Sequence, residues 1–193
     1  MRFPRTTDNH TLDDDIKMFF ALTNAAFDAG IVVWECKLNY DYARPASAIH
    51  YIYRHERIFA WGGPGRGRIE MNGKDWRSYI TQPPFPDYIS GHSAFSAAST
   101  EILKQFTGSD AFEKTGTFAP GASRIEPNVT PAIPVTLSWR TFSDAADQAG
   151  ISRRIGGIHF EEADIRSRIC GRLVALTVWD KVMGYINGTA GQQ

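Results

Sequence analysis

The sequence has only two cysteines, no excess of either charge and no apolar run in its first 17 residues, and we expect each absence to exclude a class of protein. Cys36 and Cys170 cannot form a disulfide framework, and neither has a second thiol at the spacing of a metal-binding motif. Lysine plus arginine number 21, as do aspartate plus glutamate. No net field therefore draws the whole chain to nucleic acid or to an anionic membrane, so an anion site must be a local cluster of cations.

The N-terminal segment, MRFPRTTDNHTLDDDIK, has no apolar stretch of secretory or transmembrane length. We therefore expect a soluble chain without a signal peptide or membrane span, and nothing in the sequence indicates a compartment. With 193 residues, of which 42% are hydrophobic, the chain is long enough to bury one core. We expect a single domain over residues 1–193.

Apolar residues recur every three or four positions along much of the chain, which predicts a mainly α, all-helical bundle. Thr11 is a suitable N-cap for a first helix that Pro45 ends. Further helices are expected at residues 46–60, 91–106, 141–149 (stopped by Gly150) and 160–185. The apolar stripe of the first helix comprises Ile16, Phe19, Phe20, Thr23, Phe27, Ile31 and Trp34, and that of the last comprises Ile165, Ile169, Leu173 and Leu176. Breakers predict loops at residues 61–86 and 117–139, with at most one hairpin around 135–139.

Lys37 and Arg44 are seven residues apart, so one continuous helix would place them on the same face, about 10.5 Å apart along its axis. Two such cations near a helix end can converge on one anion, arginine through forked hydrogen bonds and lysine as a point charge. The alternative is a solvated face on which Glu35 and Asp41 pair with them locally.

Ser90, Gly91 and His92 stand at the start of the helix expected after the proline-rich loop. Free backbone amides and the helix dipole favour an anion there, and Ser90 adds a hydroxyl donor. A histidine at such a terminus can give or take protons near neutral pH. The alternative is a serine N-cap beside a surface histidine. Because the loop at residues 61–86 ends on this segment, we expect it to form a lid or wall over the site.

Arg153 and His159 flank a pair of glycines just before the last helix. Such glycines permit a close approach of the backbone, and the histidine would enter the site from an ordered helix start. Its other ring nitrogen could be oriented by Glu161, Glu162 or Asp164. The alternative is a histidine that merely pairs with a local carboxylate. His10, His50 and His55 lack such neighbours and are interpreted as surface residues.

Taken together, these segments supply what a buried phosphate-like anion requires, namely several fixed positive donors that offset its desolvation. They also match the signature of the vanadium-dependent haloperoxidase and type 2 phosphatidic acid phosphatase superfamily, Lys-x6-Arg-Pro, Pro-Ser-Gly-His and Ser-Arg-x5-His. The matching residues are Lys37, Arg44 and Pro45, then Ser90, Gly91 and His92, and then Ser152, Arg153 and His159. The chain most resembles bacterial vanadium chloroperoxidase-like proteins. The resemblance implies the helical bundle of that superfamily, of which this chain looks like the C-terminal half, with long loops.

By this resemblance, vanadate, or phosphate as a competing occupant, would be bound by Lys37, Arg44, Ser90, Gly91, Arg153 and His159. His159 would be the covalent partner and the one metal ligand, bonded to vanadium in a peroxidase and phosphorylated in a phosphatase. His92 would be the acid–base, and Lys37 would polarise the peroxide.

Some positions bear on the branch of the family. Ile89 stands where the family usually has proline. The family's histidine is often backed by an aspartate four residues on, where this chain has Ala163, with Asp164 one later. Trp34 and Phe85 match the chloroperoxidase pattern in particular, in which they would wall the halide pocket.

The favoured function is a vanadate-dependent haloperoxidase that oxidises halide with hydrogen peroxide at a histidine-bound vanadate. One alternative is a soluble acid phosphatase that cleaves a phosphomonoester through a phosphohistidine. The other is an inactive oxyanion-binding fragment, since relatives usually carry a long helical region before the lysine, and only 36 residues precede Lys37. A missing N-terminal helical region would leave exposed apolar stripes or cause self-association. Neither a nucleic-acid partner nor a membrane span is expected.

Overall fold

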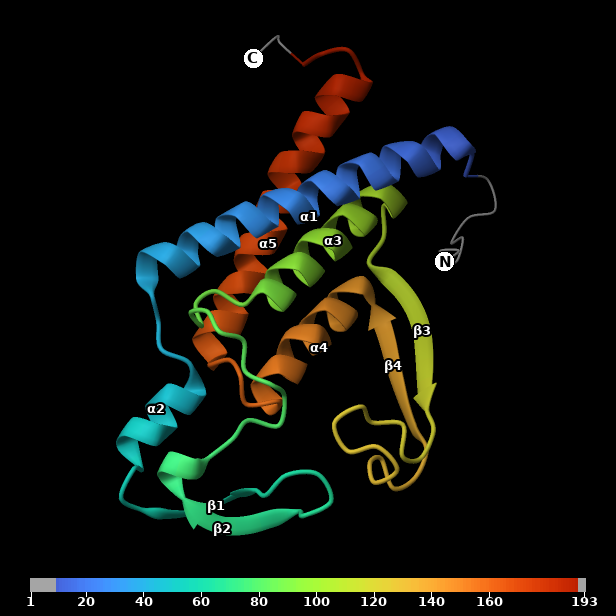
Figure 1. Ribbon diagram of the computed structural model, residues 1–193. Coiled ribbons are helices and arrows are strands. Elements are labelled where there is room, and N and C mark those ends of the chain that lie inside the picture. The colour runs from blue at the N-terminus through green and yellow to red at the C-terminus, as the bar shows by residue number, and fades with distance from the viewer. Residues whose placement is uncertain (1–9, 191–193) are drawn as a thin grey trace.

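The computed structural model describes residues 10–190 and forms a helical bundle flanked by two antiparallel hairpins (Figure 1). The helices are α1 (Leu12–Tyr40), α2 (Pro45–Ile52), α3 (Gly91–Thr107), α4 (Phe142–Ile155) and α5 (Glu161–Ile186), with a single 3₁₀ turn, η1 (Gly73–Asp75). The strands are β1 (Arg57–Trp61), β2 (Arg68–Asn72), β3 (Ala111–Phe118) and β4 (Val135–Thr141). The expected helical bundle is confirmed, but the chain is all-α only approximately.

Helix α3 lies at the centre of the bundle and packs against α1, α4 and α5, while α1 crosses over both α3 and α5 (Figure 1). Small side chains make these close crossings possible. The buried face of α1 includes Ala21, Ala25 and Ala29, which join one apolar core with α3 and α5. A Cβ at Gly171 of α5 would lie 2.3 Å from the carbonyl oxygen of Ala94. The core is therefore built from backbones in near contact rather than from large side chains.

The large apolar side chains of α1 and α5 lie on the outside of these helices. Phe27 is 68% exposed and Leu173 is 60% exposed. The other exposed members of the two predicted stripes include Ile16, Phe20, Ile31 and Trp34 on α1, and Ile165, Ile169 and Leu176 on α5. The helical period was thus predicted correctly, but the apolar stripe is not the face that packs within this chain.

Both hairpins correct the sequence-based assignment. Residues 57–60 were predicted to end a helix, but they alternate between exposed and half-buried positions and, together with Trp61, pair with β2. That alternation, with a period of two, is typical of a strand. Glycines with positive φ at Gly63, Gly65 and Gly67 form the turn. Strand β3 lies largely before the predicted loop and pairs with β4, close to the place where a hairpin was expected.

The first helix ends earlier than predicted, and this changes the relation between Lys37 and Arg44. Asp41 caps α1 in the left-handed region at φ 44°, and Arg44 is the N-cap of α2, with Pro45 as its first residue. The two cations therefore do not share one helix face. They are brought together by the turn between two helices, for which proline at the first helical position is well suited.

The stretch Leu12–Ile52, which contains α1 and α2, is long and apolar enough by length and composition to cross a membrane. A signal sequence or a core helix of a soluble protein meets the same criterion. This finding qualifies the expectation that the chain has no apolar run of that length.

Gly150 lies inside α4 instead of ending it, and its missing side chain makes room for a buried ionic network. Arg168 donates from Nε to Asp164 at 2.8 Å and also pairs with its second oxygen, and the hydroxyl of Ser93 donates to Asp164 at 2.8 Å. A Cβ at Gly150 would lie 2.0 Å from that carboxylate. The network ties α3, α4 and α5 together.

We predict that Gly150→Ala destabilises the fold by about 1–3 kcal/mol, because the added methyl must displace Asp164 from Arg168 and Ser93. Thermal and denaturant unfolding measure the effect. Gly184→Ala in α5 is the matched control, since its Cβ would make only ordinary contacts of 3.7 Å. That control should be neutral or stabilising by up to about 1 kcal/mol. Equal stability of the two variants would contradict the packing described here.

Candidate active site

Lys37 and Arg44 are held by backbone carbonyl oxygens of one short segment, Phe85 to Asp87. The ammonium of Lys37 donates to the carbonyls of Pro86 at 2.7 Å and Asp87 at 3.0 Å. Arg44 donates from Nε to the carbonyl of Phe85 and from one terminal nitrogen to that of Pro86 at 3.2 Å. Its other terminal nitrogen donates to the carbonyl of Ile158 at 2.8 Å. The segment therefore fixes both cations against the start of α5.

These two cations are deeply buried and form no salt bridge with a carboxylate of the described residues. Lys37 is 2% exposed and Arg44 is 3% exposed. Among residues 10–190, neither they nor Arg153 forms a salt bridge. The predicted alternative, a solvated face paired with Glu35 and Asp41, is therefore wrong. Each side chain also retains N–H donors beyond those used by the carbonyls.

Phe85 and Trp34 cover the two cations with aromatic surface. The Phe85 ring centroid lies 5.2 Å from the Lys37 ammonium and 5.0 Å from the guanidinium carbon of Arg44. The ring of Trp34 contacts that of Phe85, with centroids 5.1 Å apart. A ring face is attractive to cations, so this arrangement holds the charges while excluding water from one side.

His159 comes from the turn between α4 and α5, and its Nδ1 makes a short hydrogen bond with the carboxylate of Asp87. His159 is 7% exposed and Asp87 only 1% exposed. The second oxygen of Asp87 accepts the Phe160 backbone N–H at 3.4 Å. With Nδ1 engaged, Nε2 is the nitrogen left for a ligand.

Asp87 is the residue that sequence analysis missed. The three predicted partners of His159 are all engaged elsewhere: Glu161 pairs with Arg154, Glu162 with Arg166, and Asp164 with Arg168. A signal was present, since Asp87 is the only acidic residue between Asp75 and Glu101 and stands three positions before Ser90. As the one carboxylate of the segment that leads directly into Ser90, Asp87 was a candidate partner for a site histidine.

Ser90 is the N-cap of α3 and is fully buried, while its backbone N–H donates to the carbonyl of Ala163 at 3.1 Å. Its oxygen accepts the Ser93 N–H, as an N-cap does, and also forms a 3.0 Å hydrogen bond with the Ser93 hydroxyl. Binding an anion would require the Ser90 hydroxyl to give up or share that bond. Gly91 and His92 follow in the first turn, where His92 is partly exposed. The start of α3 is thus anchored to the start of α5, beside His159.

Arg153 lies in the last turn of α4, and its Nε is buried with no hydrogen-bond partner among the described residues. The following glycines allow the loop before α3 to pack closely on this turn. A Cβ at Gly156 would lie 2.2 Å from the Ile80 side chain, and the Ile80 N–H donates to the Gly156 carbonyl at 3.0 Å. The predicted loop thus forms a wall against the turn that carries Arg153 and His159.

The pKa shifts at the site reflect both burial and the charges of neighbouring site residues. Burial lowers the pKa of His159, the hydrogen bond to Asp87 opposes this, and the charges of Arg44 and Lys37 lower it further. Partial desolvation, then Arg153 and His159, lower the pKa of His92. Burial followed by the charge of Arg44 lowers the pKa of Lys37 to about 8.

The remaining histidines lie outside this cluster. A ring nitrogen of His50 is 2.8 Å from the Trp76 carbonyl oxygen, and His10 stacks edge-on against Phe106. His50 and His10 are therefore half-buried rather than simple surface residues, whereas His55 is exposed.

The donor set fits a tetrahedral oxyanion. Phosphate and vanadate need several N–H and O–H donors with positive charge, and the orphaned Nε of Arg153 is a buried donor of this kind. Groups of three or more histidine, cysteine or carboxylate residues suited to a bare metal ion do not occur in the described part of the chain.

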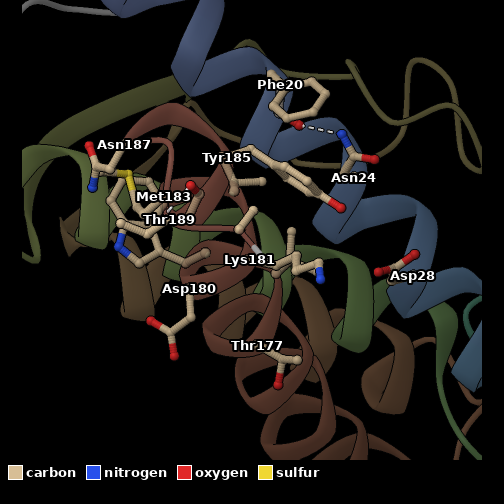
Figure 2. A pocket seen from close by; sticks show the side chains of 15 residues that line it. Phe20, Asn24, Asp28, Thr177, Asp180, Lys181, Met183, Tyr185, Asn187 and Thr189 are labelled. Carbon is tan, nitrogen blue, oxygen red and sulfur yellow. Dashed lines mark hydrogen bonds between the residues drawn. The ribbon is translucent and has the colours of Figure 1, made fainter. Parts of the chain in front are cut away.

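A groove of about 850 Å³ lies elsewhere, between α1 and the C-terminal half of α5 (Figure 2). Asn24 in its wall donates to the Phe20 carbonyl at 2.7 Å. Its one lysine, Lys181, is accompanied by two carboxylates, Asp28 and Asp180, and none of the predicted site residues lines it. Its charge does not suit an anion.

The fold is a helical bundle with a cluster of buried cations and histidines, and comparison with known proteins identifies its family. The chain belongs to the family described as the VCPO second helical-bundle domain, whose family model matches residues 17–188. The resemblance to bacterial vanadium chloroperoxidases seen in the sequence is thereby confirmed.

A curated relative, the vanadium chloroperoxidase of Curvularia inaequalis, is 29% identical over 93 residues, which cover 48% of this chain and 15% of that protein. A holo-type bacterial vanadium-dependent chloroperoxidase aligns with a TM-score of 0.82 and 27% identity over 89% of this chain and 36% of the other. A bacterial vanadium-dependent iodoperoxidase aligns with a TM-score of 0.62 and 26% identity, over 87% and 33%. The chain thus spans about a third of these solved relatives.

We predict that Lys37 makes oxyanion binding pH-dependent. Its ammonium is lost as the pH rises through about 8, so the affinity for inorganic phosphate should fall above that pH. Lys37→Met should weaken binding below pH 8 by about 10–100-fold and should remove this part of the pH dependence. Calorimetric titration with phosphate between pH 6 and about 9.5 measures the affinity of both proteins. Comparing the two affinities at each pH removes the effect of the protonation of phosphate itself, which is the same for both proteins. Parallel profiles would contradict the assignment.

Proposed function

We propose that this chain is the vanadate-binding domain of a haloperoxidase that oxidises halide with hydrogen peroxide. The observation that carries the proposal is the group of buried or half-buried cations without carboxylate partners, Lys37, Arg44 and Arg153, beside an oriented histidine. Leaving such charges buried and unpaired is costly, and an oxyanion would offset the cost. The fold and the names of the relatives support vanadate as that oxyanion.

In this proposal each side chain has one task. Lys37, Arg44 and Arg153 neutralise the oxyanion, while the Ser90 hydroxyl and the Gly91 N–H donate to its remaining oxygens. His159 binds the central atom through Nε2. When bound, vanadate supplies the activation of hydrogen peroxide for oxygen transfer to a halide ion.

His92 is the proposed acid–base. Its lowered pKa leaves the ring mostly neutral near pH 7, so that it can accept a proton from hydrogen peroxide and return it later. Lys37 adds positive charge where the peroxide is polarised. Trp34 and Phe85 supply the apolar wall of the halide pocket, where a weakly hydrated anion is shielded from bulk water.

We expect bromination of a phenol dye by the purified chain to require orthovanadate, hydrogen peroxide and bromide together. His159→Ala should abolish it, because no other described imidazole is held by a buried carboxylate at this site. His55→Ala, at an exposed histidine before β1, is the control and should retain full activity.

The same preparations distinguish the branches of the superfamily. If the chain hydrolyses a phosphomonoester, vanadate inhibits this hydrolysis and no bromination occurs, the chain is a phosphatase instead of a peroxidase. His159 would then be the nucleophile, and His92 would protonate the leaving alcohol. Near-normal activity of His159→Ala in either assay would exclude both assignments.

A second candidate function is oxyanion binding without turnover, in a domain that needs further helices. The exposed apolar stripes of α1 and α5 favour it, since isolated domains rarely expose contiguous apolar surface of that kind. The chain spans only about 36% of its solved chloroperoxidase relative. We propose that these faces pack against further helical protein.

This candidate predicts concentration-dependent self-association of the isolated chain. Combining Phe27→Lys with Leu173→Lys should reduce the association, since each introduces a charge on an exposed apolar face, and should leave the melting temperature nearly unchanged. Sedimentation equilibrium measures the association. Ile133→Lys, at a 71%-exposed loop position away from the stripes, is the control. A monomer at all concentrations that is fully active in bromination would rule this candidate out.

A further inference from the structure

Asp87 occupies a position that the family signature does not assign. We propose, building on the function above, that Asp87 is a positioning residue that holds His159 in the Nδ1–H tautomer, so that the lone pair of Nε2 faces the oxyanion. In this way the chain supplies from the loop before α3 what a carboxylate after the histidine would otherwise provide.

The tautomer follows from what each partner can donate. An ionised carboxylate only accepts hydrogen bonds, so the short contact between Asp87 and His159 Nδ1 requires the proton on the ring nitrogen. In a neutral imidazole the other nitrogen then carries the lone pair. The opposite tautomer would place a lone pair against the carboxylate and an N–H toward the cations, and both contacts would be repulsive.

Asp87 is itself held in place from several directions, which makes it suited to position another residue. Its backbone N–H donates to the Tyr42 carbonyl at 2.9 Å, and its carbonyl accepts from Lys37 at 3.0 Å. Its side chain is 1% exposed, with one oxygen on His159 and the other on the Phe160 N–H. The carboxylate therefore holds the ring in a fixed orientation before any ligand arrives.

The Phe160 N–H makes Asp87→Asn a sharp test. An asparagine has one oxygen and one NH₂ group, and the position next to that backbone donor needs the oxygen. The NH₂ group must then face His159, which can accept it only when Nδ1 carries the lone pair. The variant should therefore hold the ring in the same place but move its proton to Nε2, where it blocks the bond to the central atom.

The test combines the ring-nitrogen NMR shifts of isotopically labelled histidine with calorimetric titration of orthovanadate. His159→Gln assigns the signal of His159. We expect the Nδ1–H form in the wild-type protein without vanadate, the Nε2–H form in Asp87→Asn, and a mixture in Asp87→Ala. Vanadate affinity should fall about 10–100-fold in Asp87→Asn. Glu126→Gln is the matched control, at a buried carboxylate bonded to Trp61 and Tyr79 outside the site, and should change neither readout.

The outcomes separate the two claims. The inference would be overturned if His159 of the wild-type protein were in the Nε2–H form, a result that does not depend on the folding of any variant. It would also be overturned if His159 kept the wild-type tautomer in Asp87→Asn. If the tautomer changes as expected but the wild-type protein binds no vanadate, the positioning role is supported and the proposed function fails. Equal loss of affinity in Asp87→Asn and Glu126→Gln would also count against a specific role.

Discussion

Backbone carbonyl oxygens hold Lys37 and Arg44 inside the protein without a salt bridge, while the nearby charge of Asp87 favours their charged forms. A carbonyl dipole solvates a cation without cancelling its charge, so burial and net positive potential coexist. All but one of these carbonyls belong to the segment from Phe85 to Asp87. The same segment also carries the carboxylate of Asp87, which bonds His159 rather than a cation. Residues 85–87 therefore both hold the cations of the site and orient the ring of His159.

The loop can do this because the helices around it approach one another very closely. Gly150 and Gly171 remove the side chains that would keep α3, α4 and α5 apart, and the Asp164–Arg168 pair with Ser93 locks the crossing. The residues that carry the site stand at the ends of these helices, where free backbone groups and dipoles are available. A buried ion pair contributes little to stability by itself. Its effect here is to fix the angle at which the helix ends meet.

Much of this was predictable from the sequence, and the failures have physical causes. Helical periods located α1, α3 and α5, and the spacing of the basic and histidine residues predicted the candidate site, because each motif is local in sequence. The partner of His159 was not predictable from its neighbours in sequence, since Asp87 reaches it from 72 positions away. Strand β1 was mistaken for the end of a helix because so few residues do not distinguish the periodicity of a strand from that of a helix. The buried face of α1 was misjudged because alanine, although weakly hydrophobic, allows the closest packing.

The exposed stripe of α1 and the candidate site are not independent features. Trp34 belongs to that stripe, and its ring contacts Phe85, whose own ring lies over both Lys37 and Arg44. Any protein surface that covers the stripe at Trp34 therefore also removes water from the aromatic layer above the cations. Removing water lowers the local dielectric and strengthens the attraction between these cations and an oxyanion. One pair of aromatic rings thus links the exposed face of α1 to the cations of the proposed oxyanion site.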